Sequence, residues 1–443
     1  MEIKALTKGP KHHFFGFHDV VCSNQAGNLI LALETDIIDR PPVPGQTVTV
    51  GVVDSKSGEF QPLVETEAFN FPQGARQQWI PARDEFIFNA RVGDCWGAIR
   101  MTPKGKFLST YTQAIYHVNP DGKTGLGLNF ERMHRLGGYG YVGINDYSKA
   151  EDEHSGLTQV DLASGKVSPL LRLQEVVGFG NMPKVKEAHH FLTHALWNPS
   201  GTKIAFLHRF WLSDGGQTTR LMQVNCDGKQ LKLIAQGHFS HFDWMDDESL
   251  MIWGRQKSMI DSMRSLSGLG AFIAVPILFV LRKVKRCISR KEMFKSQSSY
   301  LKVRADCDEF ECIGNGVLTS DGHPMVNRLH PKWVLADTYP DDSGIRSLFL
   351  YNFFLNKRIE LGHFHKLNQL PVLDDLNAAQ FGFDPGVLLK FDSKEFAFAR
   401  SGLHCDLHPR WWGDFKRIAF DSIHEGIRQI YWMDVTDQLN QQT

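Results

Sequence analysis

Histidine recurs in this chain at the head of a four-residue pattern, His-x-x-Trp or His-x-x-Val. The five copies begin at His18, His194, His241, His323 and His408. Two copies align without a gap, HALWNPSGTKIAF (194–206) and HPRWWGDFKRIAF (408–420). Imidazole is a common metal ligand and acts as a general acid or base near neutral pH. A repeat of this kind indicates stacked or closed units, and closure would bring five distant histidines to one place.

The segments around each histidine follow one order: an inner strand, a turn such as Asn-Pro-Ser-Gly, a second strand, a third strand and a fourth. Third strands are expected within residues 51–59, 156–166, 220–229, 348–357 and 430–437. Two further units, at residues 76–91 and 115–132, keep this frame without the histidine, and Arg76 takes its place in the first of them. Short strands separated by Gly, Asp and Ser turns are typical of four-stranded antiparallel blades. The sequence therefore predicts an all-β fold, a seven-bladed β-propeller that forms one domain over residues 1–443.

The last unit has no fourth strand before the sequence ends, and residues 3–7 (IKALT) are expected to supply it and close the ring. An open solenoid is the alternative, although no polar capping repeats are visible. Insertions near residues 133–155, 256–299 and 365–403 interrupt the regular spacing. Long loops on a regular scaffold are where function tends to lie.

The residue that ends each second strand should lie beside the histidine that begins the first, because paired antiparallel strands share an edge. In units two to five this position holds Arg91, Arg132, Arg209 and Arg255. In units six, seven and one it holds Asp337, Asp421 and either Glu34 or Asp36. One arc of the central opening would carry guanidinium groups, which suit carboxylates. The other would carry imidazole and carboxylate, which suit Mn²⁺ or Zn²⁺.

Each of these residues also has an ordinary structural interpretation. A single histidine at the start of a strand commonly serves as a hydrogen-bonding group, and the arginines would equally well bridge neighbouring blades. The Trp and Val of the pattern are expected to pack between blades. Five histidines in one register favour a shared central site over five separate structural roles.

The composition narrows the class of protein. The 49 basic and 49 acidic residues balance, which gives no electrostatic case for nucleic-acid binding. The seven cysteines are odd in number and scattered, which favours a reducing compartment. The first residues, MEIKALTKGPKHHFFGFHD, contain no apolar run and no small-residue cleavage site. A cytoplasmic protein is therefore expected.

The most apolar stretch, residues 266–281, is followed directly by the basic run 282–291. It is short for a membrane span of roughly 20 residues, and a closed ring cannot place blades on both sides of a membrane. This part of the insertion at 256–299 is predicted to lie on the inner membrane surface, with its basic run on anionic headgroups. A buried lid over the central opening, or a dimer contact, is the alternative.

The chain resembles the oligogalacturonate lyase-like propellers, which share their architecture with TolB-type propeller repeats. The resemblance depends on the hairpin at residues 197–206 and on the segment His404-Cys-Asp-Leu-His408-Pro-Arg-Trp411. It covers most of the chain as architecture but only these two segments as motifs. Segments 241–244, 320–324 and 405–411 also look like those of uncharacterised propellers from bacterial surface-polysaccharide loci.

This resemblance implies a manganese ion that is held by histidines and a glutamine, binds a uronate carboxylate, and assists a basic residue in removing the C5 proton. His408 matches the histidine of the family's His-Pro pair, and Asp406 stands where the family has a second histidine. The family's glutamine has no clear match. A divalent metal, manganese by resemblance, is expected at His241, His323, Asp406 and His408.

Together these observations predict a metal-dependent lyase that acts by β-elimination on an acidic, uronate-containing oligo- or polysaccharide. Arg209 and Arg255 are expected to bind the substrate carboxylate, or one of them to act as the base. His194 is the substitute base, because arginine loses its proton only against a very high pKa. The candidate substrate-binding residues are His18, Arg76, Arg91 and Arg132. A non-catalytic glycan-binding or assembly scaffold is one alternative. A glycoside hydrolase with paired carboxylates is the other.

Overall fold

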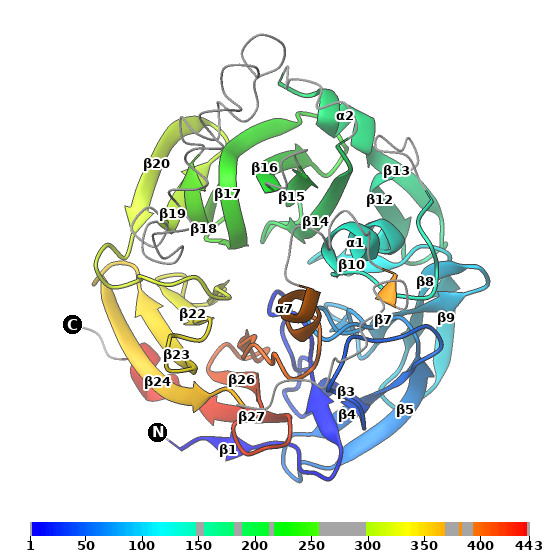
Figure 1. Ribbon diagram of the computed structural model, residues 1–443, viewed down its shortest axis with the longest axis vertical. Helices are drawn as coiled ribbons and strands as arrows, with labels where there is room; N and C mark the ends of the chain where they lie inside the picture. The colour runs from blue at the N-terminus through cyan, green and yellow to red at the C-terminus, as the bar shows by residue number, and fades with distance from the viewer. Residues whose placement is uncertain are drawn as a thin grey trace.

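Antiparallel sheets follow one another in chain order around a central axis in the computed structural model (Figure 1). The structure describes residues 2–147, 155–180, 188–211, 217–256, 298–367, 381–382 and 393–440. Within these residues five sheets have four strands and one has seven. Strands that are neighbours in the sequence are also neighbours in the sheet, so each sheet is an up-and-down meander. This is the arrangement of a β-propeller.

The first three sheets occupy the N-terminal part of the chain. The first contains β2 (His12–Phe14), β3 (Leu29–Thr35), β4 (Val48–Asp54) and β5 (Phe60–Thr66). The second contains β6 (Gln78–Trp79), β7 (Phe86–Val92), β8 (Cys95–Met101) and β9 (Phe107–Tyr111). The third contains β10 (Ile115–Val118), β11 (Thr124–Gly127), β12 (Gly156–Asp161) and β13 (Val167–Arg172).

The seven-stranded sheet follows, and two four-stranded sheets complete the ring. The large sheet contains β14 (His190–Trp197), β15 (Lys203–Trp211), β16 (Gln217–Asn225), β17 (Lys232–Trp244), β18 (Ser249–Gln256), β19 (Ser299–Arg304) and β20 (Cys307–Ile313). The next contains β21 (Met325–Val326), β22 (Trp333–Asp337), β23 (Ile345–Asn352) and β24 (Lys357–His365). The last contains β25 (Arg410–Trp411), β26 (Arg417–Ser422), β27 (Gln429–Asp434) and β1 (Lys4–Ala5).

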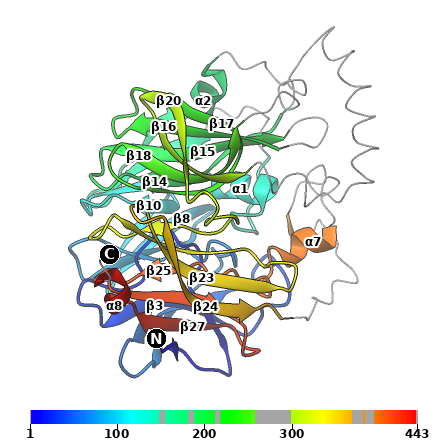
Figure 2. The ribbon, with the colours of Figure 1, turned by 90° about the vertical axis from the view of Figure 1, so that its left-hand side faces the viewer.

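Four short helices lie in the described part of the chain. They are α1 (Phe130–Gly137), α2 (Leu173–Gly178), α7 (Ser393–Phe398) and α8 (Thr436–Asn440). Figure 2 shows α7 projecting from one face of the ring, with α1 towards the same face.

The first strand of the chain closes the ring by pairing with the last. Lys4 lies opposite Trp432 and Ala5 opposite Tyr431, so β1 is the outer strand of the final sheet. Figure 1 accordingly shows β1 next to β27 at the lower edge of the ring. The prediction that residues 3–7 complete the last unit is confirmed, and the open solenoid is wrong.

The seven-stranded sheet arises because β17 connects two units: the first half of the strand pairs with β16 and the second half pairs with β18. Its first half pairs with β16, from Lys232 to Gly237. Its second half pairs with β18 from Gly237 to Trp244, and the register shifts between Phe239 and Phe242. One continuous strand therefore acts as the outer strand of one unit and the inner strand of the next.

Strand burial follows from the packing of the sheets around the axis. β3 (LILALET) is buried at most positions because neighbouring sheets cover both of its faces. The outer strand β5 (FQPLVET) is exposed or half-exposed at every position but its last. The Trp position of the repeat joins neighbouring units by indole N–H bonds, from Trp79 to the Cys22 carbonyl oxygen (3.1 Å), from Trp244 to Leu196 (3.3 Å) and from Trp411 to Met325 (2.9 Å). The predicted packing role of this position is confirmed.

One predicted strand is wrong. The segment at residues 126–132 was expected to end as a strand at Arg132, but β11 ends at Gly127 and α1 begins at Phe130. The Asn129 side chain caps this helix by accepting the Arg132 N–H at 2.7 Å. Gly138 ends it in the left-handed region (φ 68°), where glycine carries no Cβ penalty.

The apolar and basic run at residues 266–291 lies outside the described residues, as does nearly all of the insertion at 256–299. In the described part of the chain, no helix has the length and apolar character needed to cross a membrane. The membrane-surface interpretation of this insertion stays a prediction.

Candidate active site

The five histidines of the repeat meet at the centre of the ring, as the register predicts. The ring centroid of His323 lies 4.3 Å from the centroids of His241 and of His408, and 5.2 Å from the centroid of His18. His194 joins the cluster at 5.8 Å from His241. All five side chains are buried. We call these five residues the histidine cluster.

Phe17 lies among these rings and contacts every one of them. Its centroid is 4.4 Å from that of His18, 5.0 Å from His194 and 5.4 Å from His408. The distances to His241 and His323 are 5.9 and 6.1 Å. The first copy of the pattern therefore supplies both a cluster histidine and the apolar group between the rings. Phe17 directly precedes the first repeat histidine but belongs to no repeat position, so the repeat does not predict its role.

Local backbone irregularities turn these side chains toward the axis. The β14–β15 ladder shifts register between Thr193 and Leu196, and His194 between them adopts φ 53°. His408 (φ 42°) and Arg76 (φ 51°), which occupy the same repeat position, also lie in the left-handed region. A bulge or a left-handed residue redirects one side chain away from the ordinary alternation of a strand. The pattern position is thus a bend in the inner strand.

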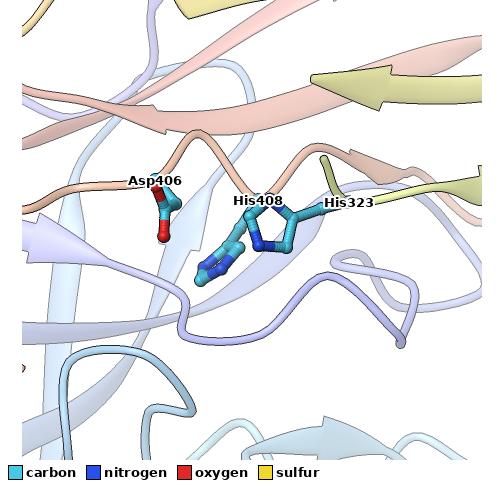
Figure 3. A group of neighbouring side chains, drawn as sticks. All are labelled: His323, Asp406 and His408. Atoms are coloured by element: carbon cyan, nitrogen blue, oxygen red, sulfur yellow. The ribbon is translucent and has the colours of Figure 1, made fainter. Parts of the chain in front are cut away.

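His323, Asp406 and His408 form the group best suited to a metal ion. One potential ligand atom from each lies within 4.8 Å of the others. Figure 3 shows Asp406 and His408 on one loop segment, with His323 approaching from the loop before β21. His241 is the fourth predicted ligand, and its ring contacts the ring of His323 with 4.3 Å between the centroids. Imidazole and carboxylate together suit Mn²⁺, Zn²⁺ or a related ion.

Several polar atoms of this group have no hydrogen-bond partner among the described residues. They are His408 Nδ1 and Asp406 Oδ1 in the group itself, and His194 Nε2 and both ring nitrogen atoms of His18 beside it. His241 Nδ1 differs, because it lies 3.5 Å from Asp321 Oδ1. Buried polar atoms normally have partners, and each exception needs an explanation. Unpaired imidazole nitrogen atoms close to a carboxylate oxygen fit a bound divalent cation, because such an ion accepts lone pairs from both.

Asp337 orients His323. Its carboxylate is fully buried and accepts hydrogen bonds from the His323 backbone N (2.7 Å), His323 Nδ1 (2.8 Å) and the His408 backbone N (3.2 Å). Because Nδ1 of His323 is held by Asp337, Nε2 is the atom left for a metal. A carboxylate behind a histidine is the common second layer of a metal site. The predicted position of Asp337 beside a repeat histidine is confirmed.

Burial and charge set the protonation of the cluster. Burial lowers the pKa of His18, His194 and His408 well below the ordinary value, so these rings are neutral at neutral pH. Burial acts in the same direction on His323, but the adjacent Asp337 carboxylate outweighs it and raises the His323 pKa. Neutral imidazole is the form that binds metals.

Asp406 is held as a carboxylate. Burial alone would raise its pKa, but the nearby His404 lowers it, and the result is a pKa well below the ordinary value. His404 Nε2 lies 3.0 Å from Asp406 Oδ2, and Arg346 Nε lies 3.7 Å from Oδ1. The predicted aspartate ligand therefore carries a negative charge beside the histidine cluster.

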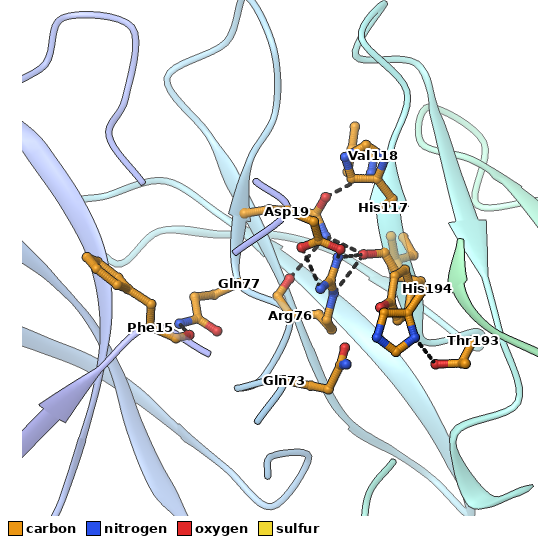
Figure 4. A network of polar contacts seen from close by, with 12 residues as sticks. Phe15, Asp19, Gln73, Arg76, Gln77, His117, Val118, Thr193 and His194 are labelled. Carbon is orange, nitrogen blue, oxygen red and sulfur yellow. Dashed lines mark hydrogen bonds and ion pairs between the residues drawn. The ribbon is translucent and has the colours of Figure 1, made fainter. Parts of the chain in front are cut away.

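Arg76 has a structural partner within the protein. It lies beside His194 and His117 in Figure 4, where its guanidinium faces Asp19. Nη1 and Nη2 donate to the two carboxylate oxygen atoms of Asp19 at 2.8 and 3.1 Å, and Nε donates to the Tyr116 carbonyl oxygen at 2.8 Å. All three nitrogen atoms are thus engaged inside the protein, and the role of Arg76 in binding substrate stays a prediction.

Arg91 and Arg132 belong to the two units without a repeat histidine, and Arg255 is displaced from the histidine of its unit. Arg132 is on α1, and its Nε donates to the His190 carbonyl oxygen. Its Nη1 lies 3.8 Å from Asp146 Oδ2. Arg91 Nη1 lies 3.8 Å from Glu67 Oε2. Arg255 lies opposite His238 and not His241, because the β17–β18 ladder continues past the bulge and Arg255 pairs near the start of β17. Glu34 lies opposite His13 and not His18, because β2 ends at Phe14, before the repeat histidine.

Arg209 is the predicted arginine that the structure does place near the cluster. It lies on β15, is buried, and its charge contributes to the lowered pKa of His194. Its Cζ atom is 5.9 Å from the ring centroid of Tyr139, which in turn lies 5.8 Å from the His194 ring. Tyr139 is not predictable from the repeat, but it lies in the insertion near 133–155, where function was expected.

Gly322 offers a test of how tightly the His323 loop packs. A Cβ atom on Gly322 would lie 1.8 Å from the Asp337 carbonyl oxygen, so the loop has to move if a side chain is added. Gly322→Ala is therefore expected to lower the free energy of unfolding by about 1–3 kcal/mol, the usual cost of overpacking. The urea midpoint of the purified variant measures it.

Gly178 provides the matched control, because a Cβ atom there meets nothing within 4 Å. Gly178→Ala is expected to leave the urea midpoint unchanged or slightly raised. Equal midpoints for Gly322→Ala and the wild-type protein would show that the His323 loop is not held in the way described.

Comparison with solved structures identifies related folds. Oligogalacturonate lyase from Vibrio parahaemolyticus superposes with a TM-score of 0.58 at 15% identity, over 99% of this chain and 94% of that one. An oligogalacturonate lyase in complex with manganese superposes with a TM-score of 0.58 at 14% identity and the same coverage. No protein-family model and no curated protein matches the sequence. At such identities the likeness shows a shared fold, the oligogalacturonate lyase-like propeller fold.

Proposed function

We propose that this protein is a metal-dependent lyase that cleaves a uronate-containing oligo- or polysaccharide by β-elimination. The observation that carries the proposal is the group of His323, Asp406 and His408, whose ligand atoms lie within 4.8 Å of one another behind the buried Asp337. The solved structures that share the fold include an oligogalacturonate lyase in complex with manganese. We take the seven-stranded sheet as two blades that share β17, which makes seven blades around the site.

The residues present fit a divalent cation, since one ligand atom each from His323, Asp406 and His408 lies within 4.8 Å of the others and Asp406 is held as a carboxylate. A cation held there would draw charge from the uronate carboxylate and so make the neighbouring C5 proton more acidic. Arg209 supplies a positive charge on the same rim and, among the described residues, makes no ion pair with a carboxylate. We assign to it the binding of substrate carboxylate. Phe17 excludes water from the centre of the histidine cluster, which strengthens the electrostatic interactions there.

Elimination leaves an unsaturated sugar, which makes the proposal simple to test. Untagged protein is incubated with a panel of acidic glycans, and ultraviolet absorbance and new reducing ends are both recorded. We expect absorbance to rise with at least one glycan, to stop when a chelator is added, and to return with Mn²⁺. Elemental analysis of the same preparation is expected to find a divalent metal.

The other outcomes separate the alternatives. New reducing ends without absorbance would indicate hydrolysis. Of the three carboxylates predicted for that role, Asp337 and Asp421 are fully buried and hydrogen-bonded within the protein. The third, Glu34, is paired with Lys11 and His13. Binding of a glycan without any change in it would indicate a scaffold. Metal-free protein that alters none of the glycans would overturn the enzyme proposal.

A further inference from the structure

Tyr139, Arg209 and Arg400 form a second polar cluster on the rim that carries the histidines. Tyr139 follows α1, Arg209 belongs to β15, and Arg400 follows α7. The proposed function as described so far uses neither Tyr139 nor Arg400. These three residues come from parts of the chain that are far apart, so only the closed ring brings them together.

The backbone around Tyr139 is fixed in place. Gly138 takes the left-handed conformation that ends α1, and a Cβ atom on Gly140 would lie 1.7 Å from the Phe130 carbonyl oxygen. The Asn70 side chain donates to the carbonyl oxygen atoms of Tyr139 (3.0 Å) and Gly140 (2.7 Å). A side chain on such a support keeps one orientation, which is what a catalytic group needs.

Two guanidinium groups face the Tyr139 side chain. Arg400 Cζ lies 4.4 Å from the ring centroid, and Arg209 Cζ lies 5.9 Å from it. Arg400 is positioned by donating Nε and Nη2 to the Gly137 carbonyl oxygen at 3.2 and 3.0 Å. Among the described residues neither arginine makes an ion pair with a carboxylate, so both positive charges act on the phenol.

The titratable groups that face Tyr139 come from four elements. They are Arg400, Arg209, His194 on β14, whose ring lies 5.8 Å away, and Tyr339 after β22. Burial alone would raise the pKa of Tyr139, but the charges and hydrogen bonds of Arg400 and Arg209 outweigh it and bring the pKa below the ordinary tyrosine value. Tyr339 shows the opposite case, because burial and the carboxylates of Asp406 and Asp321 raise its pKa well above that value.

We propose that Tyr139 is the base that removes the C5 proton of the uronate, with Arg209 and Arg400 holding it as the phenolate. This assignment rests on the proposed function. The phenolate oxygen takes the C5 proton, the electrons of that C–H bond form the C4–C5 double bond, and the C4–O bond to the leaving sugar breaks. The leaving oxygen takes a proton from water, and Tyr139 returns its proton to water, so no further reactant is needed. Tyrosine loses its proton far more readily than arginine, which removes the difficulty of an arginine base.

The decisive variant is Tyr139→Phe, which keeps the ring and removes only the hydroxyl. We expect kcat to fall by about a hundredfold or more, the range for loss of a general base, with KM and bound metal unchanged. Arg400→Gln is expected to move the acid limb of the pH–rate profile to higher pH, because loss of one positive charge raises the pKa of Tyr139. Tyr147→Phe is the matched control, since Tyr147 lies in the same loop region and is 87% exposed.

Ultraviolet difference titration of the tyrosinate band gives a readout that does not depend on activity. The wild-type protein is expected to contain one tyrosine that ionises below the ordinary range, and Tyr139→Phe is expected to lose it, whereas Tyr147→Phe keeps it. If the wild-type protein eliminates glycan and Tyr139→Phe keeps its rate within about threefold, the assignment fails while the proposed function stands. An inactive Tyr139→Phe with an unchanged titration would also overturn it, because the hydroxyl would then not be an ionised base. A wild-type protein without elimination activity removes the proposed function, and the titration still decides the state of Tyr139.

Discussion

Replacing His408 by alanine is expected to release the bound metal and to lower kcat/KM for elimination by about a thousandfold or more. Loss of a cation that stabilises developing charge removes several kcal/mol from the transition state, and about 4 kcal/mol corresponds to a thousandfold in rate. His323→Ala and Asp406→Asn are expected to act alike, because all three residues form one group. Metal content by elemental analysis and initial rates on the same acidic glycan measure the two effects together.

The design has to separate loss of a ligand from loss of the fold. His408 lies at φ 42°, where alanine is strained, so His408→Asn is the second variant, because asparagine tolerates this region. His365→Ala on β24 is the matched control, because His365 is exposed and lies outside the histidine cluster. Full metal content in folded His408→Ala and His408→Asn protein would exclude His408 as a ligand. Equal rates for these variants and the wild-type protein would remove the metal from the mechanism.

Much of the fold was predictable because its signals are local and repeated. The strands at residues 51–59, 348–357 and 430–437 were found from apolar runs between turn residues, and β4, β23 and β27 lie there. Closure by residues 3–7 followed from one missing strand in the last unit, and β1 supplies it. The exception, α1, depends on an asparagine cap and a terminal glycine within a segment that reads equally well as a strand.

The histidine cluster was also predictable, whereas the neighbours of each histidine were not. A repeat position fixes which residues approach the axis, so His18, His194, His241, His323 and His408 meet as expected. The neighbours depend on strand register, and the bulges in β14 and β17 change that register by amounts that composition does not reveal. Arg255 faces His238 and not His241, whereas Asp337 lies beside His323 as predicted and Arg209 stays near His194.

Residues contributed by the insertions were out of reach of repeat analysis. Arg400 and Tyr139 belong to no repeat position, and their proximity exists only because the ring is closed. The loop near 133–155 was marked for its length alone. The residues of the candidate site that lie on the repeated strands were therefore predictable. For the residues that lie in the insertions, only the region of the chain was predictable and not the residue.

Asp337→Ala is expected to lower the free energy of unfolding by about 3 kcal/mol or more and to abolish metal binding. The Asp337 carboxylate is fully buried and accepts the backbone N–H groups of His323 and His408 together with His323 Nδ1, so its removal leaves three buried donors unpaired. Each unpaired buried donor costs about 1–3 kcal/mol. Asp337→Asn keeps the volume and one acceptor oxygen, and it is expected to weaken metal affinity by about 10- to 100-fold, the usual effect of losing the carboxylate behind a metal-binding histidine.

Asp341→Ala separates this effect from the general loss of a carboxylate that accepts backbone hydrogen bonds. Asp341 accepts the N–H groups of Ser343 and Ile345 at 2.8 and 2.9 Å, but it is exposed, so water replaces it in the variant. Its urea midpoint is expected to change little and its metal affinity not at all. If Asp337→Asn binds metal as tightly as the wild-type protein, then Asp337 only supports the loop backbone, and the orientation of His323 has another cause. If affinity falls in Asp337→Asn while the unfolding midpoint is kept, the carboxylate acts on the metal through His323, as its position directly behind that ring implies.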